Sequence, residues 1–387
     1  MSVTRPQGFV AAGVASGIKA SGALDLSFVA TADGRPVASA GVFTSNKMTA
    51  APVIVTNRHL EHTAGRSVGV ILNSGNANAA MGKQGEADAI AMCETAAAAL
   101  GCDPHEILVC STGLIGIPLP IDIIRAGIPS VVAARSPEGG AQAAEAIRTT
   151  DTHAKQVVID GDGFVVGGMA KGAAMLEPNM ATMLAVLTTD AAASPSQLKA
   201  ALVAGVEESF NALSTDGCQS TNDTVLLFAS GVAGPVSDDE LHSAVAAACA
   251  DLAGQMAGDA EGATKVVRVT VTGAASDAEA KQGARKVADS NLCKCSWYGL
   301  DPYWGRICSE LGSAGIDFDP DRVSVRYGGV QVAAGGIEID HDRDAVATHM
   351  AGRHLDIVAD LGLGSGTGSI LTNDLTHAYI DENTGGS

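Results

Sequence analysis

The sequence contains few aromatic and few basic residues. Phe, Trp and Tyr together make up 3% of its 387 residues, so the core must be built from small apolar side chains. Lys and Arg number 24 against 43 Asp and Glu, a net charge of −19, and the basic residues form no cluster along the chain. Nucleic acid and anionic membrane surfaces are therefore not expected as partners, because both are bound through clustered positive charge.

Long apolar runs are also absent. No segment approaches the roughly 20 apolar residues that span a bilayer, and residues 1–8 lack the apolar core of a signal peptide. The eight cysteines are scattered, and none has the Cys-x-x-Cys spacing of a redox or zinc site. We therefore expect a cytoplasmic protein with reduced thiols.

Signatures for metals and nucleotides are missing as well. The histidines do not have the spacing of a zinc site, and no Gly-x-x-x-x-Gly-Lys-Ser/Thr loop occurs for a nucleotide phosphate. The glycine-rich segment 364–368 is followed by no helical pattern, so we interpret it as a turn. No metal and no bound cofactor are expected.

The hydrophobic pattern alternates between strand and helix periods, which predicts layered α/β packing. The segment 86–100 is alanine-rich, carries apolar residues at helical spacing and is ended by Gly101, so it is predicted to be a helix. Another helix is expected after Ser194, an N-cap followed by proline. Strands are expected at 24–30, 40–46, 52–56, 68–73, 107–112, 224–230 and 267–272, with a hairpin at 156–166.

The last part of the chain has a different order of elements. A helix capped by Ser276 is followed by a hairpin across Gly328 and Gly329 and by a final strand near 357–361. A helix followed by antiparallel strands indicates a smaller α+β domain.

The segment 171–190 joins an irregular stretch to a buried element. Pro178 lacks a backbone N–H and restricts Glu177 to extended geometry, so a helix cannot simply continue through it. The apolar run 183–187 suits a strand or helix start that is covered on both faces. Thr182 therefore stands at the start of a buried element, where composition alone would make it an ordinary threonine beside a strand.

This segment resembles the self-cleavage segment of the ornithine acetyltransferase (glutamate N-acetyltransferase) family of arginine biosynthesis. The family has Lys-Gly, an intervening Pro, and then Ala-Thr-Met-Leu with the threonine as nucleophile. The matching residues here are Lys171-Gly172, Pro178 and Ala181-Thr182-Met183-Leu184. Most of the chain shares the resemblance, including the string 220–223 and the ending 374–383.

The chain departs from the family at two places. Tyr303 stands where the family has asparagine in Asp-Pro-Asn-Trp-Gly-Arg, which puts local substrate fit in question. The tail after Asn383 is one residue short of the family's ending, so the match at Asn383 is firmer than the match at Ser387.

The chemistry that the resemblance implies for Thr182 is plausible for these residue types. Attack of its hydroxyl on the carbonyl of Ala181 would turn the amide into an ester, and water would then open the ester. The second chain would begin at Thr182. Its new α-amino group, with an unperturbed pKa of about 7.7 to 8.0, could act as the base for its own hydroxyl.

The resemblance also implies the other site residues. Thr112 and Gly113 match the family's oxyanion residues, although the residues alone would indicate an ordinary strand end. Without the family, Lys171 and Glu261 would be interpreted as solvated side chains. The residues that match substrate-binding positions are Thr149 (with Thr150 as the alternative in the same string), Lys171, Thr182, Glu261, Asn383 and Ser387.

The fold that the resemblance implies is α/β, a layered αββα sandwich built from both cleavage fragments. Residues 1–181 form the alpha fragment, and 182–273 complete the catalytic domain. Residues 274–387 form a smaller C-terminal α+β domain whose tail reaches the active site. The two fragments are expected to pair, as a dimer of heterodimers (a heterotetramer).

The implied reaction is a ping-pong transfer of acetyl from N-acetylornithine to glutamate through an acetyl-threonine at Thr182. The rival interpretation is an N-terminal-nucleophile amidase or aminopeptidase, in which water replaces glutamate. A processed binding protein without turnover is the non-enzyme alternative. The sequence leaves open whether acetyl-CoA also serves as donor and whether another acceptor is used.

Overall fold

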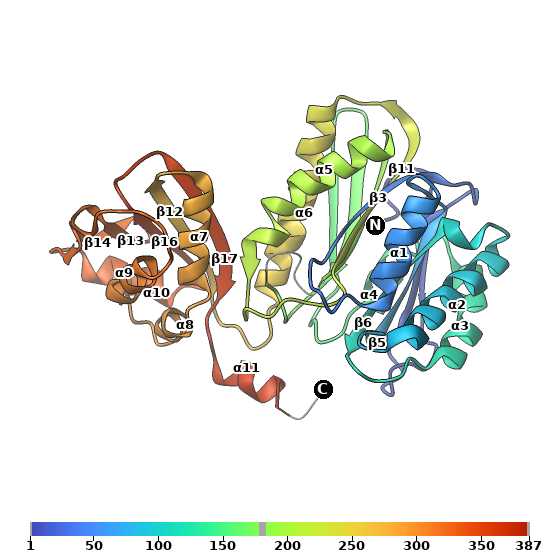
Figure 1. Ribbon diagram of the computed structural model, residues 1–387, viewed down its shortest axis with the longest axis horizontal. Helices are drawn as coiled ribbons and strands as arrows, with labels where there is room; N and C mark the ends of the chain where they lie inside the picture. Colours follow the sequence, from blue (N-terminus) through green and yellow to red (C-terminus); the bar gives the residue numbers. More distant parts are fainter. Residues whose placement is uncertain (1, 178–182, 385–387) are drawn as a thin grey trace. The chain divides into compact units, whose positions relative to one another are not determined.

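The computed structural model describes residues 2–177 and 183–384 (Figure 1). These residues form two compact units. The first comprises Met1–Asn211 and Gln219–Met256, and the second comprises Ala212–Cys218 and Ala257–Ser387. Within the described ranges, no helix combines the length and the apolar character needed to cross a membrane.

The first unit contains a four-stranded and a six-stranded sheet. The four-stranded sheet has the order β1-β2-β5-β6, and its β5 and β6 are parallel. Its strands are β1 (Phe9–Val14), β2 (Leu26–Thr31), β5 (Gly69–Asn76) and β6 (Ile107–Leu114). The six-stranded sheet has the order β4-β3-β11-β9-β8-β7, with β9 and β11 parallel at its centre. Its strands are β3 (Val37–Phe43), β4 (Arg66–Ser67), β7 (Lys155–Asp160), β8 (Val165–Lys171), β9 (Leu184–Ala192) and β11 (Thr224–Pro235).

The two sheets pack face to face. One hydrophobic cluster contains Val70 and Leu108 from the four-stranded sheet together with Val186 and Phe228 from the six-stranded sheet. The other face of the four-stranded sheet shares a second cluster with helices α1 (Ala51–His62), α2 (Gly82–Leu100) and α3 (Ile121–Ala134). Helices α5 (Pro195–Glu207) and α6 (Asp238–Gly258) lie on the outer side of the six-stranded sheet (Figure 1). The predicted αββα sandwich is therefore confirmed.

Helix α4 packs against β1 and β8 and so contacts both sheets. The predicted helix at 86–100 is part of α2, which ends at Gly101 in a left-handed conformation with φ of +85°. The predicted cap at Ser194 is present, because its side chain accepts the N–H of Gln197. The helical segments of this part of the chain are α1 (Ala51–His62), α2 (Gly82–Leu100), α3 (Ile121–Ala134), α4 (Gly140–Ala146), α5 (Pro195–Glu207) and α6 (Asp238–Gly258), with short 3-10 turns at Pro104–Glu106 and Phe210–Ala212.

The second unit is built on one mixed sheet with the order β10-β17-β12-β16-β13-β14-β15. Buried residues of this sheet pack with helices α7 to α10 in a single core that includes Trp297 and Tyr327. The strands are β10 (Leu213–Ser214), β12 (Val266–Ala274), β13 (Ser324–Tyr327), β14 (Val330–Ala334), β15 (Ile337–Glu338), β16 (His354–Asp360) and β17 (Gly366–Asn373). The helices are α7 (Asp277–Ala288), α8 (Asn291–Tyr298), α9 (Trp304–Gly312), α10 (Arg343–Ala351) and α11 (His377–Glu382), with a 3-10 turn at Pro320–Arg322.

Three expectations from the sequence differ from the structure. The segment 52–56, predicted to be a strand, lies in α1, where Pro52 occupies the first turn and Thr56 Oγ1 donates to the Val109 carbonyl. The segment 357–361 is not the last strand, because β17 follows it and begins at Gly366 inside the expected turn. The second compact unit consists of Ala212–Cys218 and Ala257–Ser387 rather than starting near 274, because β10 pairs with β17 and β12 pairs with β16 and β17.

Candidate active site

Thr112 and Gly113 lie at the carboxyl end of β6, where the Thr112 side chain is buried. Gly113 has φ of +133°, and a Cβ added to it would lie 2.3 Å from the carbonyl carbon of Gly75 on the neighbouring strand. Only glycine allows the two strands to approach so closely at this point. The Thr112 hydroxyl and the Gly113 N–H therefore belong to one tightly constrained strand end, as an oxyanion site requires.

The side chain of Asn222 connects the two sheets next to this strand end. Its Nδ2 donates to the carbonyl oxygen of Ser111 at 2.9 Å and to that of Ala77 at 2.6 Å. Ser111 directly precedes Thr112 on β6, whereas Asn222 lies just before β11 of the other sheet. The position of Thr112 is thus tied to the start of β11. In the sequence, Asn222 is only one residue of the polar string 220–223, and no local signal indicates its role.

The next residue, Asp223, binds the start of β9. Its side chain is completely buried, and its Oδ1 accepts the N–H of Met183 at 2.9 Å. Burial raises the pKa of the Asp223 carboxyl well above its usual range, and hydrogen bonds from the Met183 N–H and the Ser220 side chain, together with the nearby charge of Lys171, offset this only in part. No local sequence signal distinguishes Asp223 from the other polar residues of the string 220–223.

The predicted cleavage point, Ala181 and Thr182, lies outside the described residues. The described residues on its two sides lie next to each other, because Lys171 at the end of β8 pairs with Leu184 at the start of β9. The chain therefore leaves and re-enters the six-stranded sheet at neighbouring positions. Both positions lie at the end of the sheet where Asp223 binds Met183.

Lys171 is buried, with 3% of its surface exposed, so the alternative of a solvated lysine is wrong. Its positive charge acts on two buried carboxyls, Asp151 and Asp223. A buried ammonium group needs such partners, because its desolvation is costly. Lys171 is therefore an internal cation at the end of β8, and its environment was not predictable from its neighbours in the sequence.

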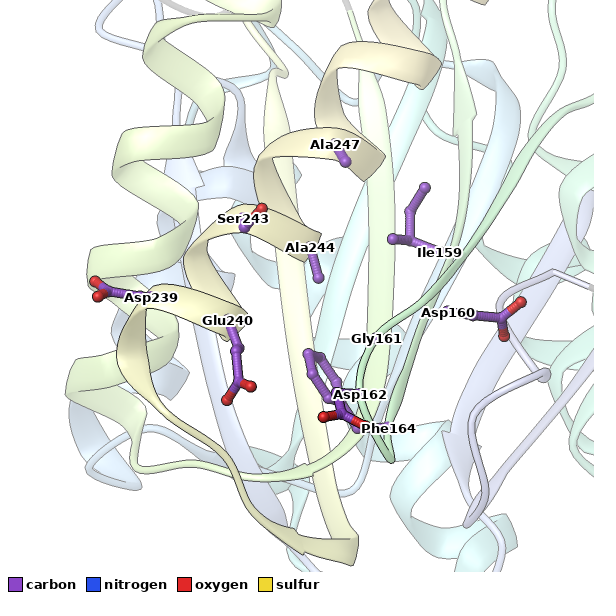
Figure 2. A pocket seen from close by; sticks show the side chains of 10 residues that line it. All are labelled: Ile159, Asp160, Gly161, Asp162, Phe164, Asp239, Glu240, Ser243, Ala244 and Ala247. Carbon is purple, nitrogen blue, oxygen red and sulfur yellow. The ribbon is translucent and has the colours of Figure 1, made fainter.

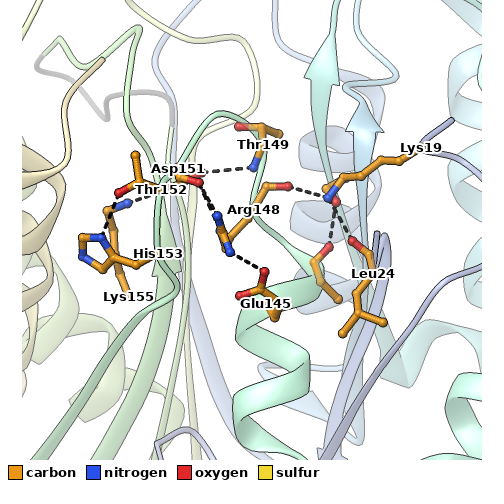
Figure 3. A network of polar contacts seen from close by, with 11 residues as sticks. Lys19, Leu24, Glu145, Arg148, Thr149, Asp151, Thr152, His153 and Lys155 are labelled. Carbon is orange, nitrogen blue, oxygen red and sulfur yellow. Dashed lines mark hydrogen bonds and ion pairs between the residues drawn. The ribbon is translucent and has the colours of Figure 1, made fainter. Parts of the chain in front are cut away.

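Asp151 is the centre of a polar network that includes the predicted substrate-binding residue Thr149 (Figure 3) and also reaches Gly172, the residue after Lys171. Its Oδ1 accepts from Lys155 Nζ at 2.6 Å and from the N–H of Gly172 at 2.7 Å, and its Oδ2 accepts from the N–H of Thr149 at 3.1 Å. Thr149 is half-buried, whereas its alternative Thr150 is exposed. Asp151 thus fixes the backbone at Thr149 and directly after Lys171.

Glu261 and Asn383, the predicted binding residues of the second unit, are in direct contact. Asn383 Nδ2 donates to Glu261 Oε2 at 2.8 Å. The contact depends on α11, whose N-cap Thr376 also donates to the carbonyl of Gly262 at 2.8 Å. The structure therefore brings together two residues that are far apart in the sequence. Ser387 lies outside the described residues.

Tyr303, which departs from the family pattern, is half-exposed at the start of α9. The Arg306 guanidinium lies 5.2 Å from the centre of its ring. The exposed fraction of Tyr303 is 51%, so the larger side chain is accommodated at the surface.

A pocket of about 380 Å³ lies elsewhere in the first unit, between the β7–β8 turn and α6 (Figure 2). Phe164 forms part of its apolar lining, and Asp160, Asp162 and Glu240 add carboxylates. Glu240 is engaged in capping α6, because it accepts from the N–H and the hydroxyl of Ser237. None of the predicted site residues that the structure describes lines this pocket, so we do not take it as the candidate active site.

The cysteines and acidic residues provide no evidence for a metal centre. All eight cysteines are free thiols. Across residues 2–177 and 183–384, no group of three or more His, Cys, Asp or Glu side chains is arranged to hold a metal ion.

Comparison with known proteins gives one consistent family. The model of the ArgJ family matches residues 10–385. A protein of Mycobacterium bovis named arginine biosynthesis bifunctional protein ArgJ is 49% identical over 99% of this chain and 95% of its own length. The Streptomyces coelicolor protein of the same name is 47% identical over 99% of both chains.

Solved structures with the same family names match about half of this chain. The ornithine acetyltransferase of Mycobacterium tuberculosis complexed with ornithine is 45% identical, covers 47% of this chain and 96% of its own, and has a TM-score of 0.42. The Bacillus halodurans ArgJ structure is 34% identical, covers 51% of this chain and 95% of its own, and has a TM-score of 0.49.

Proposed function

Because this chain belongs to the ArgJ family, we propose that it is a self-processing acetyltransferase of arginine biosynthesis that moves an acetyl group from N-acetylornithine to glutamate. The observation that carries the proposal is 49% identity to a bifunctional ArgJ protein over 99% of the chain. Two observations support it: Asn222 ties the strand end at Thr112 to the start of β11, and Lys171 pairs with Leu184 at the start of β9.

Self-cleavage supplies the nucleophile. The Thr182 hydroxyl attacks the Ala181 carbonyl carbon, the peptide C–N bond breaks, and the hydroxyl proton passes to the departing nitrogen. Water then hydrolyses the ester, which leaves a carboxylate on Ala181 and a free amine and hydroxyl on Thr182. An N-terminal threonine is an activated nucleophile, because its own amine can serve as base.

Acetyl transfer then takes two displacements. Thr182 Oγ attacks the acetyl carbonyl of N-acetylornithine while its amine takes the hydroxyl proton, and the Thr112 hydroxyl and the Gly113 N–H stabilise the oxyanion. Collapse breaks the C–N bond, and the proton goes to the amino group of the departing ornithine. The amino group of glutamate then attacks the acetyl-threonine, which releases N-acetylglutamate and restores the Thr182 hydroxyl.

Charged residues bind the substrates. We assign Lys171 to the α-carboxylate, since it is a buried cation in a protein of net charge −19. The backbone of Thr149 is held by Asp151, which accepts its N–H. Glu261, Asn383 and Ser387 complete the substrate-binding set, and the first two form a hydrogen-bonded pair.

The relatives in Mycobacterium bovis and Streptomyces coelicolor are named as bifunctional proteins. We therefore propose that acetyl-CoA also serves as an acetyl donor, as a substrate of the same nucleophile. The enzyme is proposed to need no other cofactor and no metal.

We further propose that the two fragments stay together as a heterotetramer in the cytoplasm. Eight free thiols fit a reducing compartment. Native mass spectrometry tests the assembly, and cell fractionation tests the location.

One product assay separates this function from hydrolysis. Purified protein with N-acetylornithine and glutamate should form ornithine and N-acetylglutamate in equal amounts. Free acetate in place of N-acetylglutamate would support an amidase with water as acceptor. A lack of both products would support a processed binding protein.

A further inference from the structure

The hydroxyl of Tyr379 ties helix α11 to a segment that lies 163 positions away in the sequence. Tyr379 Oη donates to Asp216 Oδ2 at 3.2 Å. Partial burial and the negative charge of Asp216 raise the pKa of Tyr379 above its usual range, so the hydroxyl keeps its proton and acts as the donor. Asp216 belongs to the segment Ala212–Cys218, which is part of the same compact unit as α11. The bond therefore joins two parts of one unit through a charged acceptor.

Asp216 lies in a segment that the core of this unit fixes. Its Oδ1 accepts the N–H of Cys218 at 3.1 Å. The carbonyl of the preceding residue, Thr215, accepts from the buried ammonium of Lys294 at 2.9 Å. Lys294 Nζ also donates to the carbonyl at the end of β17, at 3.1 Å. Tyr379 is thus bonded to a well-anchored acceptor.

The loop that carries Glu261 lies against α11 at Tyr379. Gly262 has φ of +61°, and a Cβ added to it would lie 2.3 Å from the backbone nitrogen of Tyr379, so only glycine allows this approach. One helical turn later, Asn383 Nδ2 donates both to the Tyr379 carbonyl at 2.9 Å and to Glu261 Oε2 at 2.8 Å. The backbone of Tyr379 therefore sets the point from which Asn383 reaches Glu261.

Helix α11 is too short to hold this position by itself. It has six residues, whereas isolated helices shorter than about 12 residues are marginal in water. Tyr379 is half-buried, and the other five residues of the helix are exposed. The place of the helix consequently depends on its cap at Thr376 and on the side chain of Tyr379.

We propose that Tyr379 is a positioning residue for substrate binding, because its hydroxyl, held by Asp216, fixes α11 where Asn383 meets Glu261. This inference rests on the proposed function, in which Glu261 and Asn383 bind substrate. Glu261 brings a negative charge to the pair, which suits the cationic side-chain amino group of N-acetylornithine. Loss of the Tyr379 hydroxyl weakens binding and leaves the chemical step unchanged.

The test is Tyr379→Phe, which keeps the ring and removes only the donor. We expect the KM for N-acetylornithine to rise about tenfold, comparable with the loss of one hydrogen bond to a charged group. The kcat should stay within about twofold of wild type, because a change confined to binding leaves turnover at saturation intact. Calorimetric titration with the product ornithine should show a rise of about tenfold in its Kd as well.

Hydrogen–deuterium exchange adds a readout that does not depend on activity. The backbone amides of α11 should exchange at least about threefold faster in Tyr379→Phe than in wild type, because local opening becomes easier when the helix loses its side-chain bond. Unchanged exchange would overturn the proposal, since α11 would then be held without this hydroxyl.

Tyr298 provides a matched control in the same unit. It is exposed at the end of α8, and its ring lies edge-on to that of His377, the first residue of α11, at 6.1 Å between centroids. Tyr298→Phe removes a hydroxyl near α11 but leaves the bond between Tyr379 and Asp216 in place. The KM, the Kd for ornithine and the exchange rates should all match wild type.

Three kinetic outcomes would also overturn the proposal. One is a KM and a Kd within about twofold of wild type in Tyr379→Phe, a change too small for a lost hydrogen bond to a charged group. Another is an equal rise in Tyr298→Phe, which would indicate a general disturbance of the unit. The third is a fall in kcat with unchanged KM, which would place the hydroxyl in the chemical step. Wild-type protein without acetyl transfer would instead contradict the proposed function itself, while the exchange of α11 would still test the bond to Asp216.

Discussion

Lys155 Nζ lies 2.6 Å from Asp151 Oδ1, and both side chains are completely shielded from solvent. A buried pair of this kind contributes little net stability compared with an apolar pair, but the loss of one partner leaves an uncompensated buried charge. The pair also anchors Gly172 and Thr149, so its loss would reach the proposed substrate-binding residues.

Asp151→Ala should therefore be strongly destabilised. We expect a loss of about 3 to 5 kcal/mol in the free energy of unfolding, because the ammonium of Lys155 stays buried without its carboxylate. Denaturant unfolding measures the change. Glu86→Ala is the matched control, since its ion pair with Arg58 is exposed and should contribute about 0 to 1 kcal/mol. Equal losses of unfolding free energy in Asp151→Ala and Glu86→Ala would contradict the assignment of Asp151 as the partner of a buried charge.

The same network predicts acid sensitivity. Burial alone would raise the pKa of Asp151, but the charges of Lys171 and Lys155 and the Gly172 N–H outweigh it and hold the pKa well below its usual range. The folded pKa is thus below the unfolded value of about 3.9, so the stabilisation is complete above that value and is lost as pH falls toward the folded pKa. Urea unfolding from about pH 6 to pH 2 should show this loss. Asp151→Asn should lack this part of the pH dependence. Identical profiles of stability against pH in the variant and in wild type would refute the prediction.

Self-cleavage at Thr182 predicts that the purified protein consists of two fragments of nearly equal length. Intact mass should find a second chain that begins at Thr182. Thr182→Ala should remain a single chain, because it lacks the hydroxyl, whereas Thr182→Ser should still be processed. A single unbroken wild-type chain with full acetyltransferase activity would rule out this nucleophile.

Thr112→Ala should lower kcat by ~10² to 10³, the usual effect of removing one oxyanion donor. Thr189→Ala is a suitable control, because Thr189 is a buried strand threonine of the same unit whose hydroxyl donates to the Val165 carbonyl at 2.8 Å. Steady-state kinetics on fully cleaved protein separates turnover from processing. Unchanged kcat in Thr112→Ala would mean that the side chain only packs.

The ping-pong mechanism predicts a covalent acetyl-threonine. Incubation with N-acetylornithine in the absence of glutamate should add one acetyl group to the fragment that begins at Thr182. Addition of glutamate should remove it and yield N-acetylglutamate. Intersecting kinetic lines without an adduct would favour direct transfer in a ternary complex.

Local sequence determined several elements because their signals act over a few residues. The helix at 86–100 has apolar side chains at helical spacing and a glycine that takes the left-handed conformation at its end. The hairpin at 156–166 has a tight turn between two apolar runs, and it appears as β7 and β8. The layered α/β architecture follows from such patterns, because each element must bury one apolar face.

Tertiary contacts decided what local patterns could not. The run 52–56 is rich in β-branched residues and was predicted to be a strand, yet it forms part of α1, because burial against β6 outweighs the weak preference of these residues for strands. Similarly, the segment that forms β12 was expected to belong to the catalytic domain, which the sequence extends to residue 273. Its pairing with β16 and β17 places it in the second unit.

The candidate site also combines residues that the sequence indicates with contacts that only the tertiary structure decides. The family motif indicates Thr182, Thr112 and Lys171 from the sequence, because chemistry restricts which residue types can act there. Nothing in the neighbours of Lys171 shows that it is buried beside two carboxyls. The bond between Asp223 and Met183 joins residues 40 positions apart, and that between Asn222 and Ser111 joins residues 111 apart. Such contacts form only when parallel strands and facing sheets bring distant segments together, so the tertiary structure alone decides them.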